Sequence, residues 1–240
     1  MWVSDYRALS FDCYGTLIDW ESGILNFLRR WSARAGVAVD DEALLETFAA
    51  VESREESRTP RKLYPAVLES VLDGIAARFG ITASAVDRAA FGQSVAYWPA
   101  FPDSVAALAE LKRHFKLIIL SNVDRASFAR SNVKLGVKFD LIVTAEDVGS
   151  YKPNARNFRT LTTRLALIGI EQQDLLHVAQ SLFHDIEPAS KMDLRTAWIN
   201  RRQGKPGHGA TKAPKPGVEA DFEFPSLKAF VDAVNADRQG

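Results

Sequence analysis

The sequence lacks most features that would place it in a membrane, a disulfide scaffold or a nucleic-acid complex. It has a single cysteine, Cys13, which excludes an internal disulfide and fits a reducing compartment. No apolar run approaches the roughly 18 residues that span a bilayer, and residues 1–5 lack the basic start of a signal peptide. Thirty basic residues balance thirty acidic ones, so no net charge favours nucleic acid or an anionic membrane. We therefore expect a cytoplasmic enzyme or binding protein.

Short apolar runs alternate with helix-length segments along the 240 residues, a pattern typical of a parallel sheet with helices on both faces. Apolar residues make up 47% and charged residues 25%, which suits one domain or one domain with an insertion. The expected strands lack clean polar and apolar alternation because both faces of such a sheet are buried. They are Ala8 to Phe11, Phe115 to Leu120, Leu141 to Thr144, Leu176 to Ala179 and Thr196 to Ile199, with a further edge strand at Asp221 to Phe224. The pattern predicts a Rossmann-like α/β core.

About a hundred residues separate the first two expected strands, far more than one crossover helix needs. Apolar residues recur there at helical spacing in three stripes, which indicates several packed helices. The stripes are Ile24, Phe27, Leu28, Trp31 and Ala35; Leu44, Leu45, Phe48 and Val51; and Leu68, Val71, Leu72, Ile75 and Phe79. We interpret residues 18–98 as an inserted α-helical cap over the strand ends, with residues 1–17 and 99–240 forming the core.

The second half of the chain contains further helices and one distinctive loop. Helices are expected from Asp103 or Ser104, after Asn154, after Pro188 and from about Ser226. Residues 201–217 are rich in Gly, Pro, Lys and Arg and contain no acid, which predicts a mobile loop. Binding of phosphate or nucleic acid by this loop is the alternative interpretation.

Polar segments follow the expected strands at the edge where ligands bind in open α/β sheets. The segment from Asp12 to Thr16 follows the first strand and combines a carboxylate with a Gly-Thr turn. Ser121-Asn122 follows the second strand, Lys152-Pro153 comes after the third, and Gln180 to Asp185 follows the fourth. Each segment alone also fits a turn, a helix cap or a surface corner. Their order and their common edge indicate a catalytic site.

The segments FDCYGT, LSNV, YKPN and VAQSLFHD resemble, in this order, the four motifs of the haloacid dehalogenase (HAD) superfamily. The resemblance covers essentially the whole chain and implies a HAD-like fold, a Rossmann-like parallel sheet with an inserted helical cap. It also implies catalytic roles for five residues. Asp12 is then a covalent nucleophile, Thr16 and Ser121 position it or the substrate, Lys152 neutralises the crowded negative charge, and Asp185 is a supporting carboxylate.

Two substitutions separate this chain from the phosphatases of the superfamily, whose first motif resembles DxDGT. The second Asp of that motif protonates a leaving alkoxide, whereas this chain has Tyr14, a phenol with an ordinary pKa of about 10. The phosphatases also bind Mg²⁺ with an acid in the fourth motif, where this chain has Gln180. Asp12 and Asp185 would then hold a metal only weakly.

The DxYGT form is what the L-2-haloacid dehalogenase branch shows, and FDCYGTLID resembles it. Displacing halide needs no metal or other cofactor, but it needs a bare carboxylate, donors for the substrate carboxylate and a cradle for the halide. We expect the substrate to be bound by backbone amides near Tyr14 and Gly15, by Ser121 and Asn122, and by Ser181 in the fourth motif. The expected reaction converts short 2-haloalkanoic acids to 2-hydroxy acids through an aspartyl ester.

The resemblance implies that an arginine of the cap binds the halide. Arg54, Arg58 and Arg61 lie in the polar stretch ESREESRTPRK, and spacing does not choose among them. A solvated charged turn is the alternative for each. The dehalogenases typically read SSNxWD in the fourth motif, whereas Leu182 and His184 replace the Asn and Trp here. These departures leave the substrate more open than the reaction type.

Two other functions remain open from the sequence. One is a HAD-type phosphatase that acts on a small phosphate ester with Mg²⁺, and the other is a non-catalytic relative that binds a ligand. In all three cases the expected partner is a small molecule. Relatives in this superfamily are often dimers, so a homodimer is an expectation, although no dimer-forming surface can be identified in the sequence.

Overall fold

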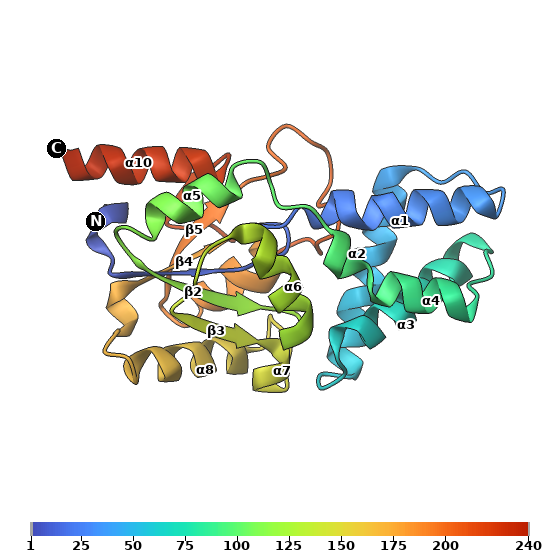
Figure 1. The fold of residues 1–240 in the computed structure, drawn as a ribbon, viewed down its shortest axis with the longest axis horizontal. Coiled ribbons are helices and arrows are strands. Elements are labelled where there is room, and N and C mark those ends of the chain that lie inside the picture. The colour runs from blue at the N-terminus through green and yellow to red at the C-terminus, as the bar shows by residue number, and fades with distance from the viewer. Residues whose placement is uncertain (1, 240) are drawn as a thin grey trace.

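A six-stranded parallel sheet forms the centre of the computed structural model, which describes residues 2–239 (Figure 1). Its strands lie in the order β3-β2-β1-β4-β5-β6. They are β1 (Ala8–Phe11), β2 (Lys116–Ser121), β3 (Leu141–Thr144), β4 (Leu175–Ala179), β5 (Arg195–Ile199) and β6 (Phe222–Phe224). This confirms the predicted Rossmann-like α/β core, with strand boundaries displaced by a residue at most.

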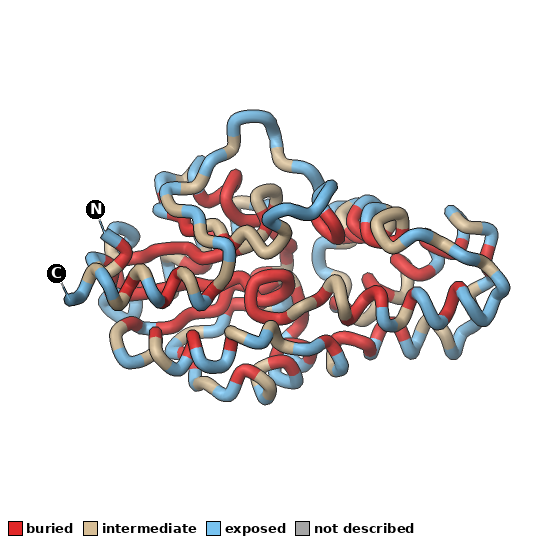
Figure 2. Tube along the Cα trace, turned by 90° about the horizontal axis from the view of Figure 1, so that it is seen from above, coloured by how far each residue is buried: buried red, intermediate tan, exposed pale blue. Residues whose placement is uncertain are grey.

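Helices cover both faces of the sheet, which explains why its central strands are mainly apolar. Alternate residues of a strand point to opposite faces. Leu9 and Phe11 therefore pack with α5 (Ser104–Leu111), α6 (Arg125–Leu135) and α10 (Leu227–Gln239). Ala8 packs on the other side with α7 (Ala145–Val148), α8 (Ala155–Ala166) and α9 (Glu187–Ser190). The central strands β1 and β4 are buried along their length, whereas the helices keep an exposed side (Figure 2).

The helices between β1 and β2 pack together in a separate body beside the sheet (Figure 1). They are α1 (Trp20–Arg34), α2 (Asp41–Arg58), α3 (Tyr64–Phe79), α4 (Ala85–Gly92) and the 3₁₀ turn η2 (Ser94–Tyr97). Further 3₁₀ turns are η1 (Val3–Asp5) and η3 (Gln172–Asp174). We refer to residues 18–98 as the cap. No helix among residues 2–239 is long and apolar enough to cross a membrane.

Local sequence signals set the ends of the cap helices. Asp19 and Asp40 accept hydrogen bonds from backbone N–H groups in the first turns of α1 and α2. Ser84 and Asp87 form a capping box at the start of α4. Gly80 ends α3 in the left-handed conformation, which glycine adopts without steric cost. Residues close in the sequence therefore determine where these helices begin or end.

The helix expected after Pro188 begins six residues earlier than predicted. A π-helical turn, η4 (Leu182–Ile186), follows β4 and runs directly into α9. The Ser181 hydroxyl accepts the His184 N–H at 2.9 Å, which starts this turn. Pro188 lies in the first turn of α9, where its missing N–H costs no hydrogen bond.

The loop 201–217, predicted to be mobile, is attached to the cap through Arg202. The guanidinium binds Glu21 of α1 at 2.6 Å and Glu42 of α2 at 2.8 Å, and only 10% of its side chain is exposed. The backbone N–H of Gly209 also donates to Glu42. The many glycines and prolines of this loop predict mobility. Composition cannot show that a single arginine of the loop binds two glutamates that are distant in the sequence.

We expect Arg202→Ala to lower the free energy of unfolding by about 1–3 kcal/mol, because it leaves two partly buried carboxylates without their cation. Urea denaturation measures the change. Lys205→Ala, in the exposed part of the same loop, is the matched control and should change little. Equal stability of the two variants would show that the Arg202 ion pairs contribute nothing.

Candidate active site

The polar segments that follow the strands meet at one edge of the sheet. On one side of β1 the next strands are β2 and β3, and on its other side they are β4, β5 and β6. Asp12 follows β1, Ser121 ends β2, and the segment from Gln180 to Asp185 follows β4. Lys152 enters from the loop between α7 and α8. This is the carboxyl edge of the parallel strands, at which ligands bind in open α/β sheets.

Lys152 joins the two catalytic carboxylates predicted from the sequence. Its Nζ donates to Asp12 Oδ1 at 2.8 Å, to Asp185 Oδ1 at 2.6 Å and to the Leu120 carbonyl oxygen at 3.0 Å. Burial alone would lower the pKa of Lys152, but its attraction to the two carboxylates raises that pKa above the ordinary value. The ammonium therefore stays charged, and three acceptors fix its position.

The second oxygen of the Asp12 carboxylate is held by Thr16. The Thr16 hydroxyl donates to Asp12 Oδ2 at 2.8 Å and accepts the Gln180 N–H at 2.9 Å. Burial raises the pKa of Asp12, whereas Lys152 and Thr16 act to lower it. Each oxygen of Asp12 thus has its own donor, an arrangement suited to a carboxylate that must attack in one direction.

Gly15 makes this close turn feasible. Its φ is +92°, and a Cβ there would lie 2.9 Å from Trp20 Nε1 and 3.0 Å from Gln180 Oε1. Its backbone N–H donates to the Ile18 carbonyl oxygen at 2.8 Å. The turn therefore uses the Gly15 donor itself, and substrate binding by backbone amides near Tyr14 and Gly15 stays a prediction.

Asp185 is held from the interior of the sheet by a residue that the motifs do not include. His177 of β4 makes a hydrogen bond through Nε2 to Asp185 Oδ1 at 2.9 Å and through Nδ1 to the Ser10 hydroxyl at 2.8 Å. Burial would raise the pKa of Asp185, but Lys152 and His177 lower it. Its other oxygen, Oδ2, is buried without a hydrogen-bond partner among the described residues.

Two further residues predicted to bind substrate lie at the site with different consequences. The Ser121 hydroxyl is buried and has no hydrogen-bond partner among the described residues, but Ser121 is not among the residues that line the cavity beside Asp12. The side chain of Asn122 instead exchanges two hydrogen bonds with the backbone of Lys152, at 2.7 and 3.0 Å. Its amide group also donates to Glu56. Asn122 therefore positions the Lys152 loop and also lines the cavity beside Asp12, and its expected use as a substrate donor stays a prediction.

Tyr14 and Ser181 line the cavity beside Asp12, but their hydroxyl groups have protein partners. The Tyr14 hydroxyl lies 2.9 Å from the Ser131 hydroxyl of α6. The Ser181 hydroxyl lies 3.2 Å from His184 Nδ1 and accepts the His184 N–H. Burial lowers the pKa of His184 to about 4, so its imidazole is neutral at neutral pH.

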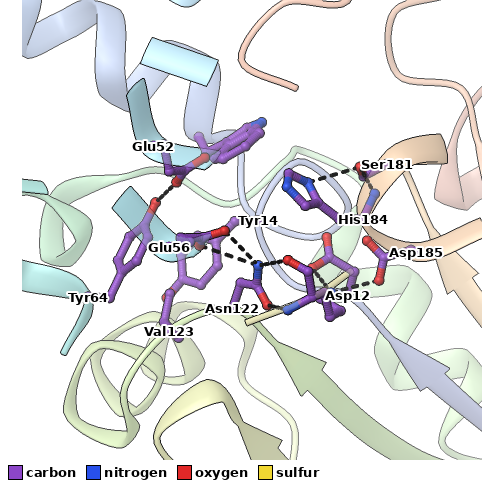
Figure 3. A pocket seen from close by; sticks show the side chains of 12 residues that line it. Asp12, Tyr14, Glu52, Glu56, Tyr64, Asn122, Val123, Ser181, His184 and Asp185 are labelled. Carbon is purple, nitrogen blue, oxygen red and sulfur yellow. Dashed lines mark hydrogen bonds and ion pairs between the residues drawn. The ribbon is translucent and has the colours of Figure 1, made fainter. Parts of the chain in front are cut away.

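The cap faces this site with two carboxyl groups. Glu52 and Glu56 of α2 are 3% and 4% exposed and lie in the cavity together with Asp12 (Figure 3). The Tyr64 hydroxyl of α3 donates to Glu52. Burial raises the pKa of Glu52 to about 8, so this carboxyl group is largely protonated at neutral pH, and burial also raises the pKa of Glu56 well above its ordinary value.

Arg54 and Arg58, which were expected to bind halide, do not line the cavity beside Asp12. They are exposed, as is Arg61. Residues 54 and 58 lie about 200° around α2 from residues 52 and 56, so the helix turns its glutamates to the site and its arginines away. This corrects the expectation of a cap arginine at the leaving group.

Those arginines line a second, larger cavity next to the first. It has a volume of about 590 Å³ and includes Arg54, Arg58 and Lys212. Glu56 and Lys152 border both cavities. The inner cavity has only about 30 Å³, which is space for a water molecule or two. The larger cavity is therefore a positively charged approach to the inner one, suited to attracting anions.

The residues present do not fit a divalent cation at Asp12. Gln180 provides only a neutral oxygen, and the Lys152 ammonium already binds both Asp12 and Asp185. Within residues 2–239, no cluster of three or more His, Cys, Asp or Glu side chains is placed to hold a metal ion. A hard cation requires more anionic oxygen ligands than this arrangement provides.

Comparison with known proteins identifies the family. The sequence model of the haloacid dehalogenase-like hydrolases matches residues 6–193. The chain belongs to this family.

Relatives within the family carry out different reactions. N-acylneuraminate-9-phosphatase from Rattus norvegicus is 29% identical over 135 residues, which cover 54% of this chain and 52% of that protein. (S)-2-haloacid dehalogenase from Pseudomonas putida is 28% identical over 107 residues, which cover 43% of this chain and 45% of that enzyme. The chain thus spans about half the length of the curated relatives it matches.

Solved structures share the fold over almost the whole chain. The L-2-haloacid dehalogenase of Xanthobacter autotrophicus, solved with chloropropionic acid covalently bound, superposes with a TM-score of 0.75 at 18% identity. The match covers 96% of this chain and 98% of that one. At this identity the likeness establishes the common fold.

We expect Lys152→Met to lower the free energy of unfolding by about 3–5 kcal/mol, because it leaves Asp12 and Asp185 buried without their cation. The pKa of Asp12 should rise further, since the lysine acts to lower it. Urea denaturation of this variant and of the exposed control Lys138→Met measures the difference. Two equally stable variants would contradict a central role for the Lys152 contacts.

The raised pKa of Glu52 predicts how stability depends on pH. Between about pH 4.5 and about pH 8 the folded protein keeps a proton on Glu52 that the unfolded chain has lost. The free energy of unfolding should therefore fall as the pH rises through this window and level off above it. Denaturation of the wild type and of Glu52→Gln as a function of pH tests this, since the variant should decline less. Identical profiles would show that Glu52 is not protonated in the folded protein.

Proposed function

We propose that this protein hydrolyses the carbon–halogen bond of short 2-haloalkanoic acids through a covalent ester of Asp12. The observation that carries the proposal is the state of Asp12, a buried carboxylate with one donor on each oxygen and no second acid in its own motif. Tyr14 stands where a phosphatase of this superfamily has its acid, and its hydroxyl group is paired with Ser131. Halide is a weak base and leaves without a proton, so the chemistry needs no acid there.

The proposed first step is a displacement at carbon. An oxygen of Asp12 attacks C2 of the substrate, and the electron pair of the carbon–halogen bond leaves with the halide. The Ser121 hydroxyl, buried without a partner in the described chain, is proposed to donate to the substrate carboxylate. Lys152 keeps Asp12 oriented and reduces the repulsion between that carboxylate and an anionic substrate.

The second step hydrolyses the ester. Water attacks the carbonyl carbon of the esterified Asp12, which releases the 2-hydroxy acid and restores the carboxylate while a proton passes to solvent. Asp185 Oδ2 is unpaired among residues 2–239 and buried near the lysine, so it can accept a hydrogen bond from that water. His177 fixes Asp185 from behind. The same lysine then neutralises Asp12 as its negative charge returns.

A phosphatase acting on a small phosphate ester is the second candidate, and the rat phosphatase relative favours it. Gln180 argues against it, because it provides a neutral oxygen where the phosphatases of the superfamily have an anionic ligand for Mg²⁺. We therefore rank it below dehalogenation.

Release of halide from 2-chloropropionate or chloroacetate in the presence of EDTA tests the proposal. We expect turnover without metal in the wild type and a loss of about 10⁴-fold or more in Asp12→Asn, which lacks the nucleophile. Asp232→Asn, at an exposed ion pair on α10, is the control. Turnover of phosphate esters alone, dependent on added Mg²⁺, would overturn the proposal, and so would inactivity of the folded protein toward both classes.

A further inference from the structure

The proposed reaction requires a group that stabilises the leaving halide, in addition to Asp12, Lys152 and Asp185. A departing halide carries a full negative charge and requires hydrogen-bond donors or a cation near it. Lys152, the cation at the cavity, is already bonded to Asp12 and Asp185. Arg54 and Arg58 lie outside the inner cavity. The cap side chains that line the same cavity are therefore candidates to stabilise the leaving group, beside the neutral imidazole of His184, whose Nε2 has no partner among the described residues.

Among the side chains that the cap turns toward Asp12 are the carboxyl groups of Glu52 and Glu56. Glu52 and Glu56 are four residues apart on α2 and therefore lie on one face of that helix. Each has one protein donor, Tyr64 for Glu52 and Asn122 for Glu56. Since Tyr64 donates to Oε1 of Glu52, the oxygen Oε2 is the one that can carry a proton toward the cavity.

The surroundings of the two glutamates determine which form they take. The titratable side chains that share the cavity with them are Asp12 and Tyr14 after β1, Tyr64 from α3, Lys152 from its loop, and His184 and Asp185 from η4. His184 is neutral, and Lys152 is shared by the two aspartates. Glu56 also borders the larger cavity with its exposed Arg54 and Arg58, but neither glutamate has an ion-pair partner among the described residues, and burying two further ionised carboxylates beside Asp12 is unfavourable. The surroundings therefore favour the neutral carboxyl form, an O–H donor.

We propose that Glu52 and Glu56 bind the departing halide through their carboxyl O–H groups, in the role for which the family resemblance implies a cap arginine. This inference rests on the proposed dehalogenation and names the leaving-group site for it. The electron pair of the broken carbon–halogen bond goes to the halide, and each proton remains on its glutamate as a hydrogen-bond donor. No acid is consumed, so the cap returns unchanged after each turnover.

Two consequences distinguish carboxyl donors from an arginine. An arginine stays charged at all accessible pH values, whereas Glu52 loses its proton above about pH 8 and its carboxylate then repels halide. Fluoride is the most basic halide and the strongest hydrogen-bond acceptor, so its departure depends most on O–H donors. Bromide, a weak acceptor, depends on them least.

The decisive experiment compares Glu52→Gln and Glu52→Ala with the wild type on fluoroacetate, chloroacetate and bromoacetate. Glutamine keeps a neutral donor, so this variant should retain activity at neutral pH and exceed the wild type above pH 8. Alanine removes the donor, and kcat should fall by about 10²-fold for fluoroacetate and far less for bromoacetate. Glu46→Gln, at an exposed position of α2, controls for changes in the helix. Equal losses for all three halides, or a glutamine variant no more active than the alanine variant, would overturn the inference.

Halide binding separates this inference from the proposed function. Chloride binding, followed by broadening of the halide NMR signal, should be present at neutral pH in the wild type and in Glu52→Gln. It should be absent in Glu52→Ala and should disappear from the wild type above pH 8. Chloride binding without any haloacid turnover would reject the proposed function while keeping the halide site. Absence of chloride binding in the wild type at neutral pH would reject the halide site itself.

Discussion

Lys152 contacts two carboxylates that come from different strands, and the rest of the site depends on this contact. Asp12 follows β1 and Asp185 follows β4, and their negative charges would repel each other if they were buried without a cation. The lysine is itself placed by the Leu120 carbonyl oxygen and by the reciprocal hydrogen bonds between its backbone and Asn122. One ammonium group thus fixes the spacing of the strand ends as well as the charge of the nucleophile.

The contact also explains why the interior of the sheet contains polar residues. His177 and Ser10 lie on neighbouring strands and are fully buried, which costs free energy unless their hydrogen bonds are made. Ser10 bonds to His177 and His177 bonds to Asp185, so this polar path ends at the carboxylate that Lys152 holds. The buried polar residues of β1 and β4 thus support the site.

The sequence predicts the core of the site because its residues lie at positions defined by the backbone. Asp12, Ser121 and Asp185 stand directly at or near the ends of apolar strands, and parallel strands end at one edge. The fold follows from the same alternation of short apolar runs and helices. The protein partners of Gly15 and Asn122 could not be predicted, because a sequence shows which groups can donate but not which acceptors the folded chain places beside them.

The sequence predicts that the cap is helical. It does not show that the cap turns acidic side chains toward the site. The apolar stripe of α2 includes Phe48, and Glu52 and Glu56 continue that face at helical spacing. Acidic residues on an otherwise apolar face of α2 therefore indicate a buried polar site, whereas Arg54 and Arg58 are distinguished only by their charge. His177, a titratable residue inside an apolar run, was a similar signal. In both cases the information lay in a polar residue at a buried position of the pattern.

The ion pairs of Arg202 hold the cap against the core. The inner cavity holds a water molecule or two, so a substrate can enter only after the cap has moved away from the strand ends. Arg202 bridges that boundary, since it belongs to the core and binds acids on both α1 and α2. Any movement of the cap away from the strand ends must therefore break two ion pairs of one largely buried guanidinium, which couples the position of the cap to that of the loop 201–217.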